Sequence, residues 1–169
     1  MFAISILLSL FFLAWAFFLT TVTHALTLLG ETHSMEVVRE RRAKFIYLNI
    51  HRFIFKISHF ELLVFSSTIG ESLGRLGFIA FAAIGLLHTE TSTTSLVALL
   101  ILTLFVFLLI GDFFPRLWAI RNPEKALLSS LPFTSLFLLL SLPFSLLFLK
   151  LSELALKARQ KMSLGDPIE

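Results

Sequence analysis

The sequence predicts an all-α integral membrane protein with three transmembrane helices. Of its 169 residues, 57% are hydrophobic, and the mean hydropathy of +0.91 is too high for an ordinary soluble domain. Three runs contain no Asp, Glu, Lys or Arg: residues 1–29, 96–110 and 126–149. These runs lack the polar face of a soluble surface helix, and a bilayer span needs roughly 20 mostly apolar residues.

Residues 1–29 are predicted to form the first span. A secretory signal peptide would have a basic start and an apolar run about half as long. Positive charge follows this run instead of preceding it. We therefore expect the segment to remain in the mature protein, with the N-terminus outside.

The second and third spans are predicted at residues 62–87 and 96–114. The short segment 88–95 between them is polar and has no Lys or Arg, whereas basic residues follow the first and third spans. The positive-inside rule places those two basic loops in the cytoplasm and segment 88–95 outside. The location predicted is the inner or plasma membrane.

The amphipathic stretch 36–60 mixes apolar, aromatic and basic residues, which predicts helices at the cytoplasmic interface. The run 126–149 contains Pro132 and Pro143 and precedes a basic tail. A fourth span would put that tail outside, so we expect a re-entrant or Pro-kinked juxtamembrane segment, with a true fourth span as the alternative. Residues 1–157 are the predicted membrane domain, and 158–169 form a short cytoplasmic tail.

Several functional classes are not expected. The chain has no cysteine, so it has neither a disulfide framework nor a thiolate metal site. Its net charge of +3 lies in short loops between spans, which predicts contact with membrane lipid and not with nucleic acid. Nucleotide-binding and hydrolase motifs are absent from the sequence, so no enzyme activity and no tightly bound cofactor are expected.

Ionisable residues at membrane depth are the main functional candidates, because they are costly there. Glu71 and Arg75 are four residues apart and so share a helix face. They either form a structural ion pair or take part in the protein's function. Asp112 lies before Pro115, which lacks an N–H and leaves a backbone acceptor free nearby. Alternatively, Asp112 is an interfacial partner of Arg116. Carboxylates, free carbonyls and the Ser67 hydroxyl are the oxygen ligands that Mg²⁺ or Ca²⁺ prefer.

Three stretches resemble the CNNM/CorC magnesium transporter family of haemolysin-C-like proteins. Residues 111–126 resemble its Gly-Glu-x-x-Pro-Lys signature followed by Asn-Pro. Residues 11–19 resemble its first-helix motif, Phe-Phe-Ser-Ala-Ser-Glu-Thr-Ala-Leu, and residues 68–73 its second-helix Ile-Gly-Asn-x-Leu. The order and spacing fit across roughly residues 3–157.

The resemblance implies three spans, a cytoplasmic helix pair after the first, a juxtamembrane belt after the third, and a homodimer. It implies transport, as export, of Mg²⁺ or a related divalent cation. The ion would be held by a first-helix serine, by second-helix polar groups such as Ser67 and Glu71, and by the third-helix carboxylate, Asp112.

The sequence departs from the family motifs at the implied site. Trp15 and Ala16 replace the first-helix Ser-Glu, Glu71 replaces an asparagine, Asp112 replaces a glutamate, and Arg116 replaces a lysine. The family's regulatory cystathionine-synthase-like pair is not in this sequence, as expected of an excised membrane domain or a diverged member. A non-transporting membrane scaffold or regulatory module of the same fold is therefore the second hypothesis.

Overall fold

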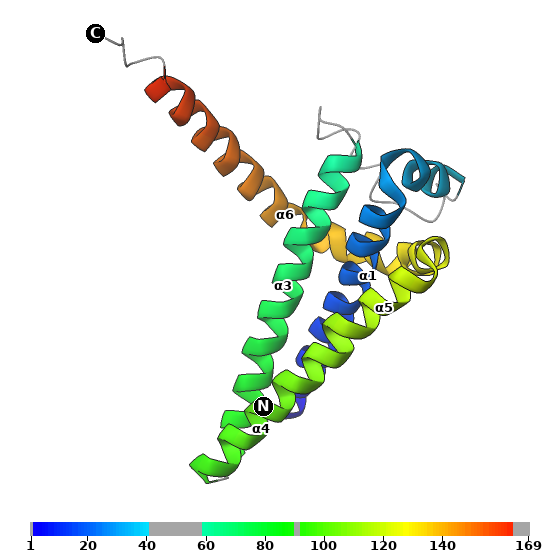
Figure 1. The fold of residues 1–169 in the computed structure, drawn as a ribbon. Helices are drawn as coiled ribbons and strands as arrows, with labels where there is room; N and C mark the ends of the chain where they lie inside the picture. The colour runs from blue at the N-terminus through cyan, green and yellow to red at the C-terminus, as the bar shows by residue number, and fades with distance from the viewer. Residues whose placement is uncertain (1, 41–58, 90–91, 164–169) are drawn as a thin grey trace.

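The computed structural model describes residues 2–40, 59–89 and 92–163, and every element in those ranges is helical (Figure 1). The predicted all-α class is confirmed. The elements are α1 (Phe2–Glu40), α3 (His59–Leu87), α4 (Thr93–Phe107), the π-helical turn η2 (Leu108–Phe113), α5 (Phe114–Arg121) and α6 (Pro123–Ser163). Within the described ranges, four helices are long and apolar enough to cross a membrane, one more than the three predicted.

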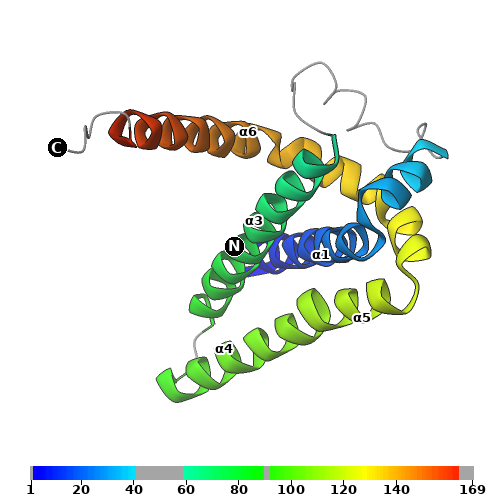
Figure 2. The ribbon, with the colours of Figure 1, turned by 45° about the horizontal axis from the view of Figure 1, so that its top comes forward.

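Helix α1 bends at Gly30, directly after the predicted end of the first span. The Gly30 backbone has φ 70° and ψ 177°, a combination that only glycine adopts without strain. Ser34 donates a hydrogen bond to the Gly30 carbonyl and so fixes the bend. Beyond it the chain turns away from the straight part of α1 (Figures 1 and 2). The predicted interfacial helices over residues 36–60 lie mostly outside the described residues.

Helix α3 packs closely against α1 through its glycines. A Cβ atom at Gly74 would lie 2.9 Å from the Ala16 backbone nitrogen, and one at Gly70 would lie 2.5 Å from Leu19 Cδ1. The missing side chains therefore let the two backbones approach, as small residues do at membrane helix contacts. Gly70 and Gly74, one helical turn apart, thus serve close helix packing.

The third predicted span comprises α4, η2 and α5, which follow one another without a break from Thr93 to Arg121. Ser92 caps the start of α4 by accepting a hydrogen bond from the Ser95 backbone. The π-helical turn lies immediately before Pro115, and the Phe114 N–H bonds to Leu109 O, five residues back. Pro115 lacks an N–H, so a wider turn before it lets the helix continue with fewer broken bonds.

Over the run predicted as a re-entrant or Pro-kinked juxtamembrane segment, one helix, α6, continues through both Pro132 and Pro143. It is also long and apolar enough to cross a membrane, which was the alternative. Both views show α6 running across α3 instead of alongside it (Figures 1 and 2). Among the four apolar helices, Pro123–Phe148 has the largest share of buried residues: 39% in an apolar 18-residue segment, against 11% in the corresponding segment of Thr93–Arg121. Fully buried leucines from α1, α3 and α6 form the shared core: Leu19, Leu26, Leu63, Leu127, Leu131 and Leu138.

Candidate functional site

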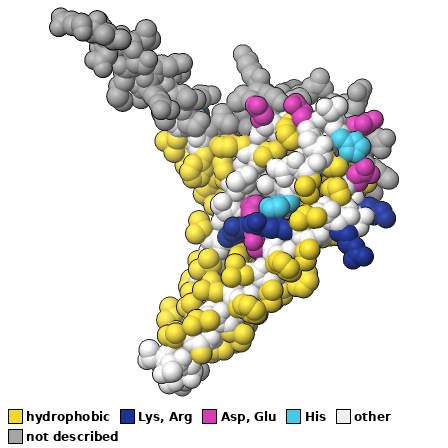
Figure 3. All heavy atoms as spheres, in the orientation of Figure 1, with side chains coloured by type: hydrophobic (Ala, Val, Ile, Leu, Met, Phe, Trp, Pro, Cys, Tyr) yellow, Lys and Arg dark blue, Asp and Glu magenta, His cyan; other side chains and the backbone are white. Residues whose placement is uncertain are grey.

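A chain of ion pairs joins α3 to η2 and α5 in the C-terminal third of the third span, Thr93–Arg121. Arg75 Nη2 contacts Glu71 Oε1 on its own helix and Asp112 Oδ1 on η2. Arg116 Nη2 lies 2.8 Å from the same Asp112 oxygen. We call these four residues the ion network. In the space-filling view, a small group of acidic and basic side chains is flanked by hydrophobic surface (Figure 3).

The ion network is neutral as a whole, since two carboxylates face two guanidinium groups. Glu71 is its most buried member, with 10% of the side chain exposed, and Asp112 follows at 22%. Arg75 and Arg116 are 35% and 43% exposed. Charges at membrane depth are tolerated when they pair in this way. The negative charge thus lies inside and the positive charge lies towards the surface.

The π-helical turn shapes the part of the site around Asp112. Gly111, beside it, is buried, and a Cβ there would lie 2.8 Å from the Phe107 ring. Phe107 in turn stacks on Phe78 of α3, with ring centroids 4.7 Å apart. Gly111 therefore leaves room for the aromatic contact that holds the end of α4, directly before η2, against α3.

Two buried hydroxyl groups lie on α3 and α1, which pack against each other. Ser67, one helical turn before Glu71, is fully buried, and its Oγ has no hydrogen-bond partner among the described residues. Thr20 on α1 is buried and unpartnered in the same sense. Such hydroxyls can supply neutral oxygen ligands to a hard cation. The structure thus brings Glu71 and Asp112 together through Arg75 and places Ser67 on the same helix as Glu71.

Trp15 occupies the position where the resemblance would place a cation-binding serine. Its indole stacks on Phe12 and Phe137, with centroid distances of 5.6 and 5.2 Å, and only 6% of the residue is exposed. Its Cδ1 lies 3.0 Å from where a Gly74 Cβ would be. Trp15 therefore fills the junction of α1, α3 and α6 as a packing residue, and it offers an N–H where the motif has an oxygen.

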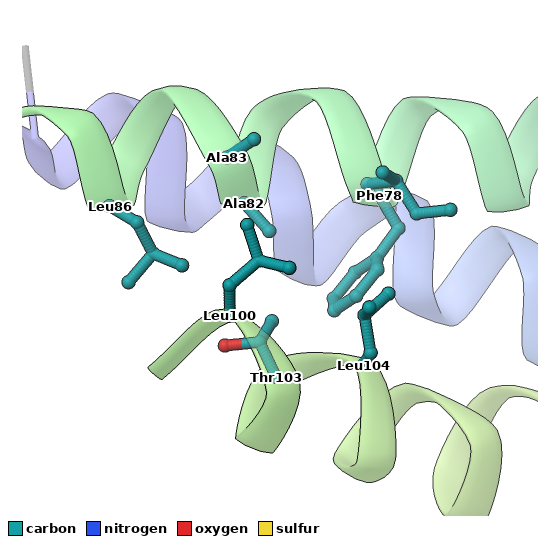
Figure 4. Close-up of a pocket in the computed structure, with 8 residues that line it drawn as sticks. Phe78, Ala82, Ala83, Leu86, Leu100, Thr103 and Leu104 are labelled. Atoms are coloured by element: carbon teal, nitrogen blue, oxygen red, sulfur yellow. The ribbon is translucent and has the colours of Figure 1, made fainter. Parts of the chain in front are cut away.

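A separate apolar pocket lies between α3 and α4, further from the ion network. Figure 4 shows Phe78, Leu86, Leu100 and Leu104 around it. Its volume is about 60 Å³, and Thr103 is its one polar lining residue. The Thr103 hydroxyl bonds to its own helix, at Leu99 O. This pocket therefore offers no charged or free polar group for an ion.

The four apolar helices and the paired charges at membrane depth define a multi-pass α-helical membrane protein. The chain matches the CNNM family, described as the cyclin M transmembrane N-terminal domain, over residues 1–165, and it belongs to that family. No curated protein matches the chain significantly, and no solved structure does. The predicted family is thus confirmed over nearly the whole sequence.

Sequence reasoning proposed both short-range pairs of the ion network but missed the bridge between them. The spacing of four residues suggested Glu71 with Arg75 and Asp112 with Arg116. The contact between Arg75 and Asp112 joins residues 37 positions apart, so spacing gave no signal for it. In the described parts of the chain, His, Asp and Glu side chains form no group of three or more that could hold a metal. Any cation here would need hydroxyl, carbonyl or water ligands as well.

Proposed function

We propose that this chain is the membrane domain of a divalent-cation transporter, with Mg²⁺ as the cargo and export as the direction. The observation that supports this most is the meeting of Glu71 and Asp112, from two different helices, at the depth of the spans. Two carboxylates match the charge of Mg²⁺, and Ser67 adds a buried neutral oxygen. Membership of the CNNM family supports the same cargo.

Asp112→Ala tests this proposal. In the purified protein, Mg²⁺ should raise the melting temperature of the wild type, and it should do so less in Asp112→Ala. Parallel titrations with Ca²⁺, Mn²⁺ and Na⁺ measure the selectivity. Glu61→Gln, which removes an exposed carboxylate from the same helix as Glu71, is the control and should respond to Mg²⁺ as the wild type does. Mg²⁺ efflux from loaded liposomes gives the functional measurement. If Asp112→Ala changes neither binding nor efflux, the transporter proposal should be abandoned.

The second candidate is a non-transporting membrane scaffold of the same fold. Its support is Trp15, stacked between Phe12 and Phe137 where the family motif has serine, together with arginines on both carboxylates. In that case the ion network would only hold α3 against η2. Absence of any divalent-cation effect on melting temperature, with liposome efflux equal to that of empty vesicles, would favour the scaffold.

For the topology, we propose three crossing spans, with α6 as a juxtamembrane helix and the C-terminus in the cytoplasm. Three observations support this. Helix α6 runs across α3 (Figure 1). A hydrogen bond of 2.8 Å between His33 Nε2 and Glu124 Oε1 connects its start to the segment beyond the Gly30 bend. Basic residues flank its apolar stretch. The natural absence of cysteine allows single-cysteine labelling in intact cells. Thr32→Cys and Ser163→Cys should resist an impermeant reagent, and Thr94→Cys should react. Labelling of Ser163→Cys would establish a fourth span.

We also propose a homodimer that pairs through the outer face of α3 and α4. Large apolar side chains on these two helices are exposed, including Leu76 at 65%, Ile101 at 61% and Phe105 at 58%. Either lipid or a second copy would cover them. If a second copy covers them, Ile101→Cys should form a disulfide-linked dimer under mild oxidation in membranes. Cross-linking only at concentrations where an unrelated membrane protein also cross-links would count against the dimer.

A further inference from the structure

Arg75 makes the contact that a cation would have to replace. A single atom, Nη2, contacts one oxygen of Glu71 and one oxygen of Asp112. The guanidinium group therefore already stands between the two carboxylates that the proposed function assigns to the cargo. We propose that Arg75 is a tethered competitor of the cation, which must leave the two carboxylates before the cation can bind. This inference rests on the proposed function and names the residue that sets the site's affinity.

The charges of the ion network make the competition necessary. Glu71, Asp112, Arg75 and Arg116 sum to zero, so a divalent cation added to the intact network would leave a net charge of +2. Uncompensated charge at membrane depth is costly, because the surroundings screen it weakly. Withdrawal of Arg75 lowers this excess to +1. It frees Glu71 Oε1 and leaves Asp112 Oδ1 in contact with Arg116 alone.

The exposure of each side chain shows which group can move. Glu71 and Asp112 are 10% and 22% exposed, so they stay with their helices. The Arg75 side chain is 35% exposed, and its buried Nε has no partner among the described residues, so it is held at the tip alone. A long side chain of this kind can turn its charged end towards water. Arg116 contacts only Asp112 within the network, so its withdrawal would leave Glu71 still occupied.

The test is Arg75→Gln, which keeps a polar side chain and removes the charge. Purified wild type and variant are titrated with MgCl₂ in detergent, and the melting temperature gives the midpoint. We expect the midpoint concentration for Arg75→Gln to be at least tenfold lower than for the wild type. Arg121→Gln is the matched control, because Arg121 is exposed on α5 outside the ion network, and its midpoint should not change.

Each outcome decides between the inference and the proposed function. If both proteins bind Mg²⁺ with the same midpoint, the competitor role of Arg75 is overturned and the transporter proposal stands. If only Arg75→Gln binds Mg²⁺, the competitor role stands and the proposal that the wild type transports Mg²⁺ fails. If neither binds, both fail. Should Arg75→Gln not fold, Arg75→Lys keeps the charge but loses the planar fork. Its midpoint should then fall about threefold, and an unchanged midpoint would overturn the inference.

Discussion

Replacing Glu71 with glutamine should measure how strongly the ion network holds α3 against η2. The change removes the most buried charge and leaves the network at +1, while Arg75 keeps Asp112 as its partner. Two unit charges 4 Å apart interact by about 4 kcal/mol at an effective dielectric constant of 20. Arg75 is 35% exposed and retains one carboxylate, so we expect a net loss of about 2 kcal/mol.

The assay is thermal unfolding of the purified protein in detergent with a chelator present, so that no divalent cation contributes. A loss of about 2 kcal/mol corresponds to a fall in melting temperature of roughly 4–8 °C for a chain of this size. Glu61→Gln should melt within about 2 °C of the wild type, because surface substitutions usually change stability by less than about 0.5 kcal/mol.

A double-mutant cycle separates the pair energy from other effects of the substitution. Combining Glu71→Gln with Arg75→Gln should give a coupling of about 1–2 kcal/mol, since residues in one salt-bridge network are not additive. A coupling below about 0.5 kcal/mol would refute the reasoning. So would a Glu71→Gln protein that melts like the wild type in chelator but no longer responds to Mg²⁺, because Glu71 would then act as an ion ligand and not as a partner of Arg75.

Four further substitutions probe the glycines of the helices, each with melting temperature as the measurement. Gly74→Val should lower the free energy of unfolding by about 1–3 kcal/mol, because its Cβ would lie 2.9 Å from the Ala16 backbone. Gly85→Ala, whose Cβ would have its nearest contact at 3.5 Å, should change stability little. Equal losses for the two variants would contradict the close-packing argument. Gly30→Ala should lose about 1–3 kcal/mol through backbone strain at φ 70°, although open space surrounds the position, and a neutral result would show that the bend relaxes. Gly111→Ala should cost about 1–3 kcal/mol because its methyl group would press on the Phe107 ring; no loss would mean that the ring moves freely.

The sequence alone was sufficient to predict the membrane environment, the family and most of the helix positions. Charge-free runs of this length have few stable alternatives to spanning helices, so composition decides the fold class. The predicted end of the first span at residue 29 lies directly before the bend of α1 at Gly30. Motif order predicted the family over residues 3–157, and the family match covers residues 1–165.

Only the tertiary structure decided how the charged residues combine. Local spacing predicts pairs four residues apart, because one helix turn brings them together, but it says nothing about which helices lie side by side. The bridge from Arg75 to Asp112 depends on the glycine contacts that set α3 against α1 and on the π-helical turn that positions Asp112. The course of α6 was likewise not in the pattern. Its prolines predict a break or a kink, and the helix continues through both while it packs against α1 and α3. Long-range packing is a property of the whole chain, so a residue's nearest neighbours in sequence could not reveal it.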